Sequence, residues 1–273
     1  MTGDITPLLL GTRVPGQAVI EELMSVQRLV QPRTRLQRIF GVSPLGPESW
    51  PWYKGALGEI AVGRILEGLG PEWLVLHAIP VGRGSSDIDH LLVGPAGVFT
   101  VNTKNHSGQS VWVAGRTLMV AGKKTRHLYN AAYEAARASK LLSAATGIAV
   151  EVTAMVVVVE PKSLTIRSNP DQVVVLREGQ VLNWLARRRR ELGPPDVGRI
   201  AAAAVLARTW HRKPLPAVDA EALQDSFSAL RLLVDQARRR RAAWVLGVPA
   251  AGVLVLANGG QMLAAILQSL GGR

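Results

Sequence analysis

The feature that most constrains this chain is the stretch Val152–Val159, which reads VTAMVVVV and has Thr153 as its only polar residue. A strand can be apolar along its length when both of its faces are buried. The stretch therefore predicts an interior strand of a sheet that is covered on both sides.

Helices and further strands are expected around this strand. Apolar residues at helical spacing predict helices at 17–30, 54–70, 130–146, 179–191, 196–210 and in a segment that ends at 238–241. Strand patterns occur at 73–81, in hairpins at 85–108 and 111–121, and at 173–176. The order predicts an α/β (α+β) fold with a mixed central β-sheet flanked by helices.

Prolines and composition suggest where this fold is divided. The proline-rich segment 43–53 predicts a break in regular structure, and 213–220 predicts a linker. We expect four regions: an N-terminal helical extension, a core, a strand with helices that completes the core, and a C-terminal helical extension, at 1–45, 54–165, 166–212 and 221–273.

Net charge and cysteine content limit the function. The 273 residues carry a formal charge of +12, which favours polyanionic partners such as nucleic acid or an anionic membrane surface. A basic protein with no such partner is the alternative. The absence of cysteine excludes disulfides, thiolate metal sites and cysteine nucleophiles, and it suits a reducing compartment.

The hairpin at 85–108 carries polar residues that a buried sheet does not need. Asp87 and Asp89 share one face of its first strand, and Asn102 and Lys104 share one face of its second. The Gly-Pro-Ala-Gly turn between the strands brings these side chains toward one end of the hairpin. Buried charges are costly unless they are paired or hold a metal. A structural ion pair between Lys104 and Asp89 is the simpler explanation.

These residues resemble the nuclease-related domain family, NERD, over about 54–165. The resemblance rests on an ordered set of short motifs: Gly58-Glu59, Asp87 to His90, Gly97 to Phe99, Thr103 to Asn105, and Gly108. The family belongs to a nuclease superfamily whose signature is an Asp followed on the next strand by Glu-X-Lys. The resemblance implies a restriction-endonuclease-like core and metal-dependent phosphodiester hydrolysis of DNA or RNA.

The resemblance also implies roles for individual residues. Glu59 would be the acid on the leading helix, Asp89 the principal ligand of Mg²⁺ or Mn²⁺, and Lys104 the charge that steadies the phosphate. This chain departs from the family pattern at Asn102, where a Glu or Asp is expected. The ion would then be held by Asp89 and the neutral oxygen of Asn102, with Glu59 as a further candidate ligand and Asp87 as a candidate substitute for the missing acid. The alternative function is a catalytically inactive module on the same fold that binds nucleic acid or serves as a scaffold.

Basic residues outside the signature are candidate phosphate contacts. Lys123, Lys124 and Arg126 follow the second hairpin, and His106 follows Lys104. A solvated loop explains the first three equally well. His90 and His106 flank the signature and are further candidates for proton transfer, although isolated histidines near turns are commonly ordinary polar residues.

The C-terminal segment 242–267 contains no charged residue and follows four arginines. It is long enough to span a membrane with the preceding domain on the cytoplasmic side. We therefore expect a cytoplasmic protein that is either anchored to the inner face of the cell membrane or folds this segment as a buried helical hairpin. The N-terminus lacks the pattern of a secretory signal.

Overall fold

The structure is a computed structural model that describes residues 10–81, 87–211 and 218–270, with side chains described up to Pro249. The described residues fall into two units. The first contains residues 10–25 and 50–223, and the second contains residues 26–49 and 224–270. Each unit is described separately below.

The first unit is built on a five-stranded sheet of order β1-β2-β3-β7-β9. Its strands are β1 (Leu74–Pro80), β2 (Asp87–Gly94), β3 (Gly97–Asn105), β7 (Val152–Val159) and β9 (Val173–Arg177). β1, β2 and β3 are antiparallel, whereas β3, β7 and β9 run parallel. The sheet is thus mixed, as expected, and β7 lies inside it with Met155 to Val158 fully buried.

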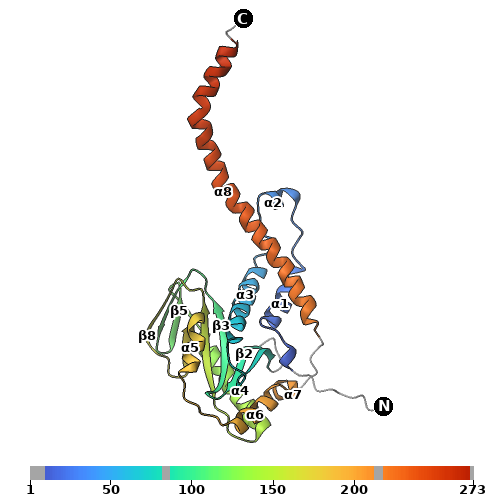
Figure 1. The fold of residues 1–273 in the computed structure, drawn as a ribbon, viewed down its shortest axis with the longest axis vertical. Coiled ribbons are helices and arrows are strands. Elements are labelled where there is room, and N and C mark those ends of the chain that lie inside the picture. Colours follow the sequence, from blue (N-terminus) through green and yellow to red (C-terminus); the bar gives the residue numbers. More distant parts are fainter. Residues whose placement is uncertain (1–9, 82–86, 212–217, 271–273) are drawn as a thin grey trace, which may run out of the picture. The chain divides into compact units, whose positions relative to one another are not determined.

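Helices cover both faces of this sheet (Figure 1). On one face, α3 (Ser49–Leu66) and α5 (Val181–Ala186) pack against Phe99, Val101 and Val157. On the other face, α4 (His127–Thr146), α6 (Pro194–Ala204) and α7 (Ala207–Trp210) share a core with β1 and β2. The remaining elements of this part are α1 (Gln17–Gln27) and two short 3-10 helices, η1 (Leu10–Thr12) and η2 (Glu178–Gln180). The predicted fold class, a mixed sheet flanked by helices, is confirmed.

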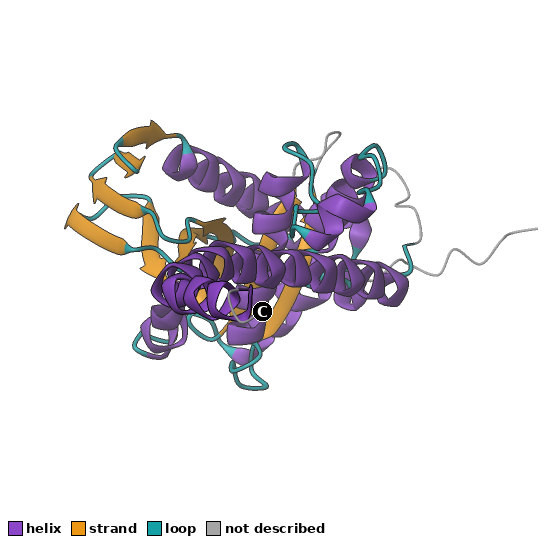
Figure 2. Cartoon of the chain, turned by 90° about the horizontal axis from the view of Figure 1, so that it is seen from above, coloured by secondary structure: helices purple, strands orange, loops and turns teal. Residues whose placement is uncertain are grey.

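A second, smaller sheet has the order β6-β5-β4-β8 (Figure 2). Its strands are β4 (Ser110–Ala114), β5 (Thr117–Val120), β6 (Lys123–Thr125) and β8 (Ser163–Ser168). Apolar residues of β4 and β5 pack with Leu128, Ala131 and Ala135 of α4. The hairpin at 111–121 was predicted, but β6 and β8 were not, because both are short and largely exposed.

The second unit contains α2 (Arg35–Ile39) and the greater part of α8 (Ala220–Leu270). Thr34 caps α2 by accepting a hydrogen bond from the backbone of Gln37. Three contacts join the end of α2 and the next residue, Phe40, to α8. Arg240 donates to the carbonyl of Arg38 (3.0 Å), Trp244 Nε1 donates to the carbonyl of Ile39 (2.9 Å), and the Phe40 and Trp244 rings lie 5.2 Å apart.

Several predicted boundaries were wrong. The break at 43–53 is partly helical, because α3 begins at Ser49 and holds Pro51 in its first turn, where the missing N–H is tolerated. The helix at 179–191 ends at Ala186, and 196–210 forms two helices. Most of the predicted linker 213–220 lies outside the described residues.

The predicted membrane span at 242–267 is not supported. No helix in the described part of the chain is both long and apolar enough to cross a bilayer. Residues 250–267 of that segment belong to α8, but their side chains lie outside the described part.

A candidate active site at the end of β3

A pocket of about 1060 Å³ lies where β3 ends and β2 begins. It is lined by the six predicted residues Glu59, Asp87, Asp89, Asn102, Lys104 and His106. Side chains from α1, α3 and α4 complete it, among them Glu21, Lys54, Asn130 and Glu134. The fold therefore brings the predicted signature together and adds acids that the sequence analysis did not single out: Glu134 from α4, and Glu21 and Glu22 from α1.

The pocket exists because the sheet loses its regular pairing at this end. The β2–β3 ladder ends with His90 opposite Val101, and the β1–β2 ladder skips Ala78, which has a positive φ of 48°. A positive φ is uncommon for a residue with a side chain and marks a local distortion of the strand. Asp89 lies at this irregularity. Its Oδ2 accepts a hydrogen bond of 2.6 Å from the backbone N–H of Thr103, which has left the ladder with β2.

The central contact of the pocket joins Asn102 on β3 to Glu134 on α4. Asn102 Nδ2 donates to both carboxylate oxygens of Glu134, at 3.0 and 2.8 Å. A carboxylate can only accept, so the amide nitrogen must face Glu134 and the amide oxygen must face away. Asn102 is only 5% exposed, and its Oδ1 has no hydrogen-bond partner among the described residues. A buried oxygen without a partner indicates that something outside the chain satisfies it.

The electrostatics of the pocket favour a bound cation. Burial and the nearby Asp89 carboxylate hold the pKa of Glu59 well above its usual range. Burial also raises the pKa of Asp89, although Lys104 and the Thr103 N–H act in the opposite direction. Burial raises the pKa of Glu134 to about 7 and that of Asp87 to about 6. Buried acids that lie near one another are stabilised as anions when a positive ion binds among them.

Lys104 is a positive charge that acts on three of these acids. It lowers the pKa of Glu59, of Asp89 and of Glu134, and its Nζ donates to the carbonyl of Thr103 at 3.0 Å. It also opposes protonation of His106 and His127, whose pKa values are lowered first by burial. Lys104 therefore influences the pKa of three acids and two histidines.

The acids alone do not form a closed metal cage. Within residues 10–81, 87–211 and 218–249, no three His, Asp or Glu side chains are grouped closely enough to hold an ion. Mg²⁺ is commonly held by one or two carboxylates together with neutral oxygens and water. Asp89, Glu134 and the unpartnered Asn102 Oδ1 provide that mixture of donors.

The other predicted contacts are placed differently. His106 lines the pocket, and its Nε2 lies 3.2 Å from Nε2 of His127. Lys123, Lys124 and Arg126 are exposed and do not line it, and the two lysines lie on β6 rather than in a loop. His90 is fully buried, with its Nδ1 2.8 Å from that of His77, so it points into the core rather than toward the pocket.

Glu134 had a signal in the sequence that could have been used. It is the only acid in α4, a helix that otherwise presents alanines and apolar residues to two sheets. A single acid on such a helix has to be exposed or satisfied. What the sequence could not provide is the rotation of the helix, which decides that this acid meets Asn102, 32 positions earlier in the chain.

Comparisons with known proteins agree with this picture. The pattern of the family described as nuclease-related domain, NERD, matches residues 54–159. An uncharacterized protein of Bacillus anthracis is 41% identical over 69 residues, which are 24% of this chain and 31% of that protein. The chain thus spans about a third of the length of this curated relative.

A comparison of structures gives a much weaker likeness. The small subunit of the heterodimeric restriction endonuclease R.BspD6I aligns with 79% of this chain and 98% of its own, at 8% identity and a TM-score of 0.21. The family match, in contrast, covers every acid of the pocket except those contributed by α1, together with Asn102 and Lys104. Residues 54–159 of this chain therefore match the pattern of the nuclease-related domain family, NERD.

Proposed function

We propose that this protein is a metal-dependent nuclease whose active site is the pocket at the end of β3. The observation that carries the proposal is the Asn102–Glu134 contact. It places a carboxylate from α4 beside the position where the family pattern expects one on β3, and it leaves the amide oxygen unpartnered.

The residues divide the work as follows in this proposal. Asp89 and Glu134 would hold a divalent ion, Mg²⁺ or Mn²⁺, and the ion would supply Lewis-acid polarisation of the phosphate. Asn102 presents its amide nitrogen to Glu134 in the metal-free structure, and it would rotate its amide to bring Oδ1 to the ion. Glu134 would contribute the negative charge that Asn102 lacks. Lys104 would bind the phosphate oxygen on which charge develops, because it is a compact cation beside the acids.

Glu59 suits a different role. It is 5% exposed, and its raised pKa keeps a proton on the carboxyl group more readily than on an exposed glutamate. A carboxylic acid that holds its proton to higher pH can give that proton to a reacting group in the transition state. Glu59 would therefore hold and return a proton at the reacting phosphate rather than bind the ion.

The test combines metal binding with cleavage. The variants are Asp89→Asn, Glu134→Gln and Lys104→Met, with Glu151→Gln, an exposed acid outside the pocket, as the control. We expect wild type and control to gain thermal stability with Mn²⁺ and to cleave labelled DNA or RNA. Asp89→Asn and Glu134→Gln should lose the Mn²⁺ response, and Lys104→Met should keep it. All three should lower cleavage about a hundredfold or more.

Two results would contradict the proposal. If Asp89→Asn and Glu134→Gln respond to Mn²⁺ as wild type does, the ion is held elsewhere. If Mn²⁺ binds but no variant and no wild-type preparation cleaves nucleic acid, the alternative function applies. That alternative is a nucleic-acid-binding module without catalysis, and the neutral amide at Asn102 is the observation in its favour.

A further inference from the structure

Two tyrosines stand exposed on α4, beside the residues that this helix contributes to the pocket. Asn130 and Glu134 line the pocket, and Tyr129 and Tyr133 immediately precede them in the sequence. Tyr129 is 60% exposed and Tyr133 is 61% exposed. Exposed aromatic rings on the surface of a helix contribute little to the core, so the presence of two of them beside pocket residues in the sequence asks for another explanation.

We infer that Tyr129 and Tyr133 form a stacking surface that binds the bases of a single-stranded nucleic acid and leads it to the pocket. The inference rests on the proposed function, since it takes nucleic acid to be the substrate. It goes further by naming the form of nucleic acid and the residues that select it.

The spacing of the two rings favours a single strand. Residues four apart on a helix have Cβ atoms about 5 to 6 Å apart. Bases stacked within a duplex rise by about 3.4 Å per step on each strand, and their faces are covered by neighbouring bases. Two tyrosines at the larger spacing therefore suit bases that have been pulled apart, as in an extended single strand.

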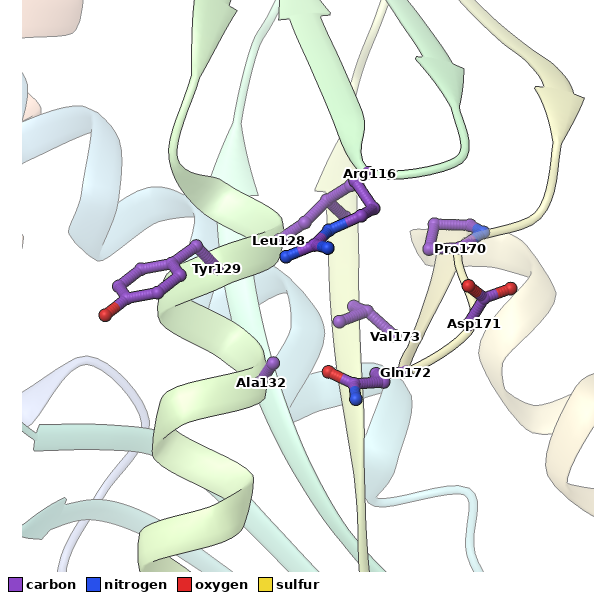
Figure 3. Close-up of a pocket in the computed structure, with 8 residues that line it drawn as sticks. All are labelled: Arg116, Leu128, Tyr129, Ala132, Pro170, Asp171, Gln172 and Val173. Carbon is purple, nitrogen blue, oxygen red and sulfur yellow. The ribbon is translucent and has the colours of Figure 1, made fainter.

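The charge around the tyrosines matches a phosphate backbone. The Arg126 guanidinium lies 4.8 Å from the centre of the Tyr129 ring, which fixes the ring and adds a cation beside it. Arg116, in the turn between β4 and β5, extends its guanidinium toward α4 near Leu128 (Figure 3). Lys123 and Lys124 are exposed on β6, which precedes α4 directly. Stacking rings among cations are the combination that binds single strands with little sequence preference.

The experiment measures binding without cleavage. A fluorescein-labelled oligo(dT) and a labelled duplex of equal length are titrated with the full chain in EDTA, and anisotropy is recorded at low and moderate salt. The variants are Tyr129→Ala, Tyr133→Ala and the double replacement. Tyr129→Phe and Tyr133→Phe are the matched controls, because phenylalanine retains the stacking face. Circular dichroism checks that every variant is folded.

We expect wild type to prefer the single strand, and its affinity to fall steeply with salt because phosphate contacts release counterions. Each Tyr→Ala change should weaken single-strand binding about tenfold, while each Tyr→Phe change should alter it less than about threefold. Binding of the duplex should change little in any of these variants.

The outcomes separate this inference from the proposed function. If Tyr→Ala variants bind oligo(dT) as wild type does, or if wild type binds neither probe at low salt, the stacking surface is wrong. If the tyrosines behave as expected but the metal-pocket variants show no effect on cleavage, the inference holds for binding and the proposed catalysis fails. Equal binding of duplex and single strand by wild type also overturns the inference.

Discussion

At the scale of single residues, Asn102 shows both what the sequence can predict and where prediction stops. The motif identifies Asn102 as the position where a negative charge is missing. It does not reveal that Glu134 on α4 accepts hydrogen bonds from Asn102, because the contact depends on how α4 packs against β3 and β7. His90 directly follows Asp89 on β2. Successive side chains on a strand point to opposite faces, and that of His90 is buried in the core.

Glu134 should make the stability of the metal-free protein depend on pH. Its pKa is raised by burial to about 7, whereas the ordinary value is 4.5. Between these values the folded state holds more protons than the unfolded state, so the free energy of unfolding contributed by this group falls as pH rises. Glu134→Gln removes this loss and keeps an oxygen to accept the hydrogen bond from Asn102.

We therefore expect Glu134→Gln to be more stable than wild type by about 2 kcal/mol near pH 8 in EDTA, and nearly equal to it near pH 4. Urea unfolding at the two pH values measures the difference. Glu151→Gln, at an exposed site, should show no such trend. A constant difference between Glu134→Gln and wild type across this pH range would mean that Glu134 titrates normally.

At the scale of elements, apolar patterns predicted the strands that have a buried face. They missed the strands that are held only by main-chain pairing with a neighbour. β7 and the strands of the two hairpins follow their apolar residues closely. β6 reads KKT and β8 reads SLTIRS, so their main-chain hydrogen bonds to neighbouring strands hold them in place without a buried face. α3 begins in a proline-rich segment because a proline in the first turn lacks only an N–H that has no helical partner.

Gly58 illustrates how an element positions the site. A Cβ atom at this position would lie 3.1 Å from Cβ of Asn105 and 3.2 Å from Cγ2 of Thr103, so α3 passes very close to the end of β3. The next residue on the helix is Glu59. A larger side chain at position 58 would push α3 away from the strand and carry Glu59 with it.

Gly58→Val should destabilise the protein by about 2 kcal/mol, because overpacking at a tight contact is typically that costly. It should also lower cleavage, since Glu59 moves. Gly198→Val is the matched control: Gly198 lies on α6 with open space around its Cβ position. Chemical denaturation and cleavage rates of both variants provide the comparison. Equal losses in the two would show that helix propensity, rather than the contact with β3, determines the role of Gly58.

At the scale of the whole molecule, the candidate site lies within one of the two units. Every residue that lines the pocket, and the whole segment that matches the nuclease-related domain, belongs to the unit formed by residues 10–25 and 50–223. The second unit joins 26–49 to α8, two segments that are far apart in sequence. Such a pairing cannot be read from either segment alone, because its contacts run through backbone carbonyls of Arg38 and Ile39.

Removal of the residues after Leu223 should therefore destabilise the segment 26–49 while it leaves metal binding and cleavage nearly unchanged. A chain that ends at Leu223 loses the Arg240 and Trp244 contacts to the last two residues of α2 and to Phe40, while the pocket residues remain. We expect its response to Mn²⁺ and its cleavage rate to stay within about threefold of wild type, because none of the lost residues lines the pocket.

We also expect trypsin to cut rapidly at arginines within 26–49 of the shortened chain. Trp244→Ala should give a partial increase in cutting, since it removes one hydrogen bond and the contact with Phe40. Unchanged protection of 26–49 in the shortened chain would show that α8 is not required for the structure of this segment. The segment would then be held by its internal contacts, such as the hydrogen bond from Gln27 to the carbonyl of Pro44 (2.8 Å).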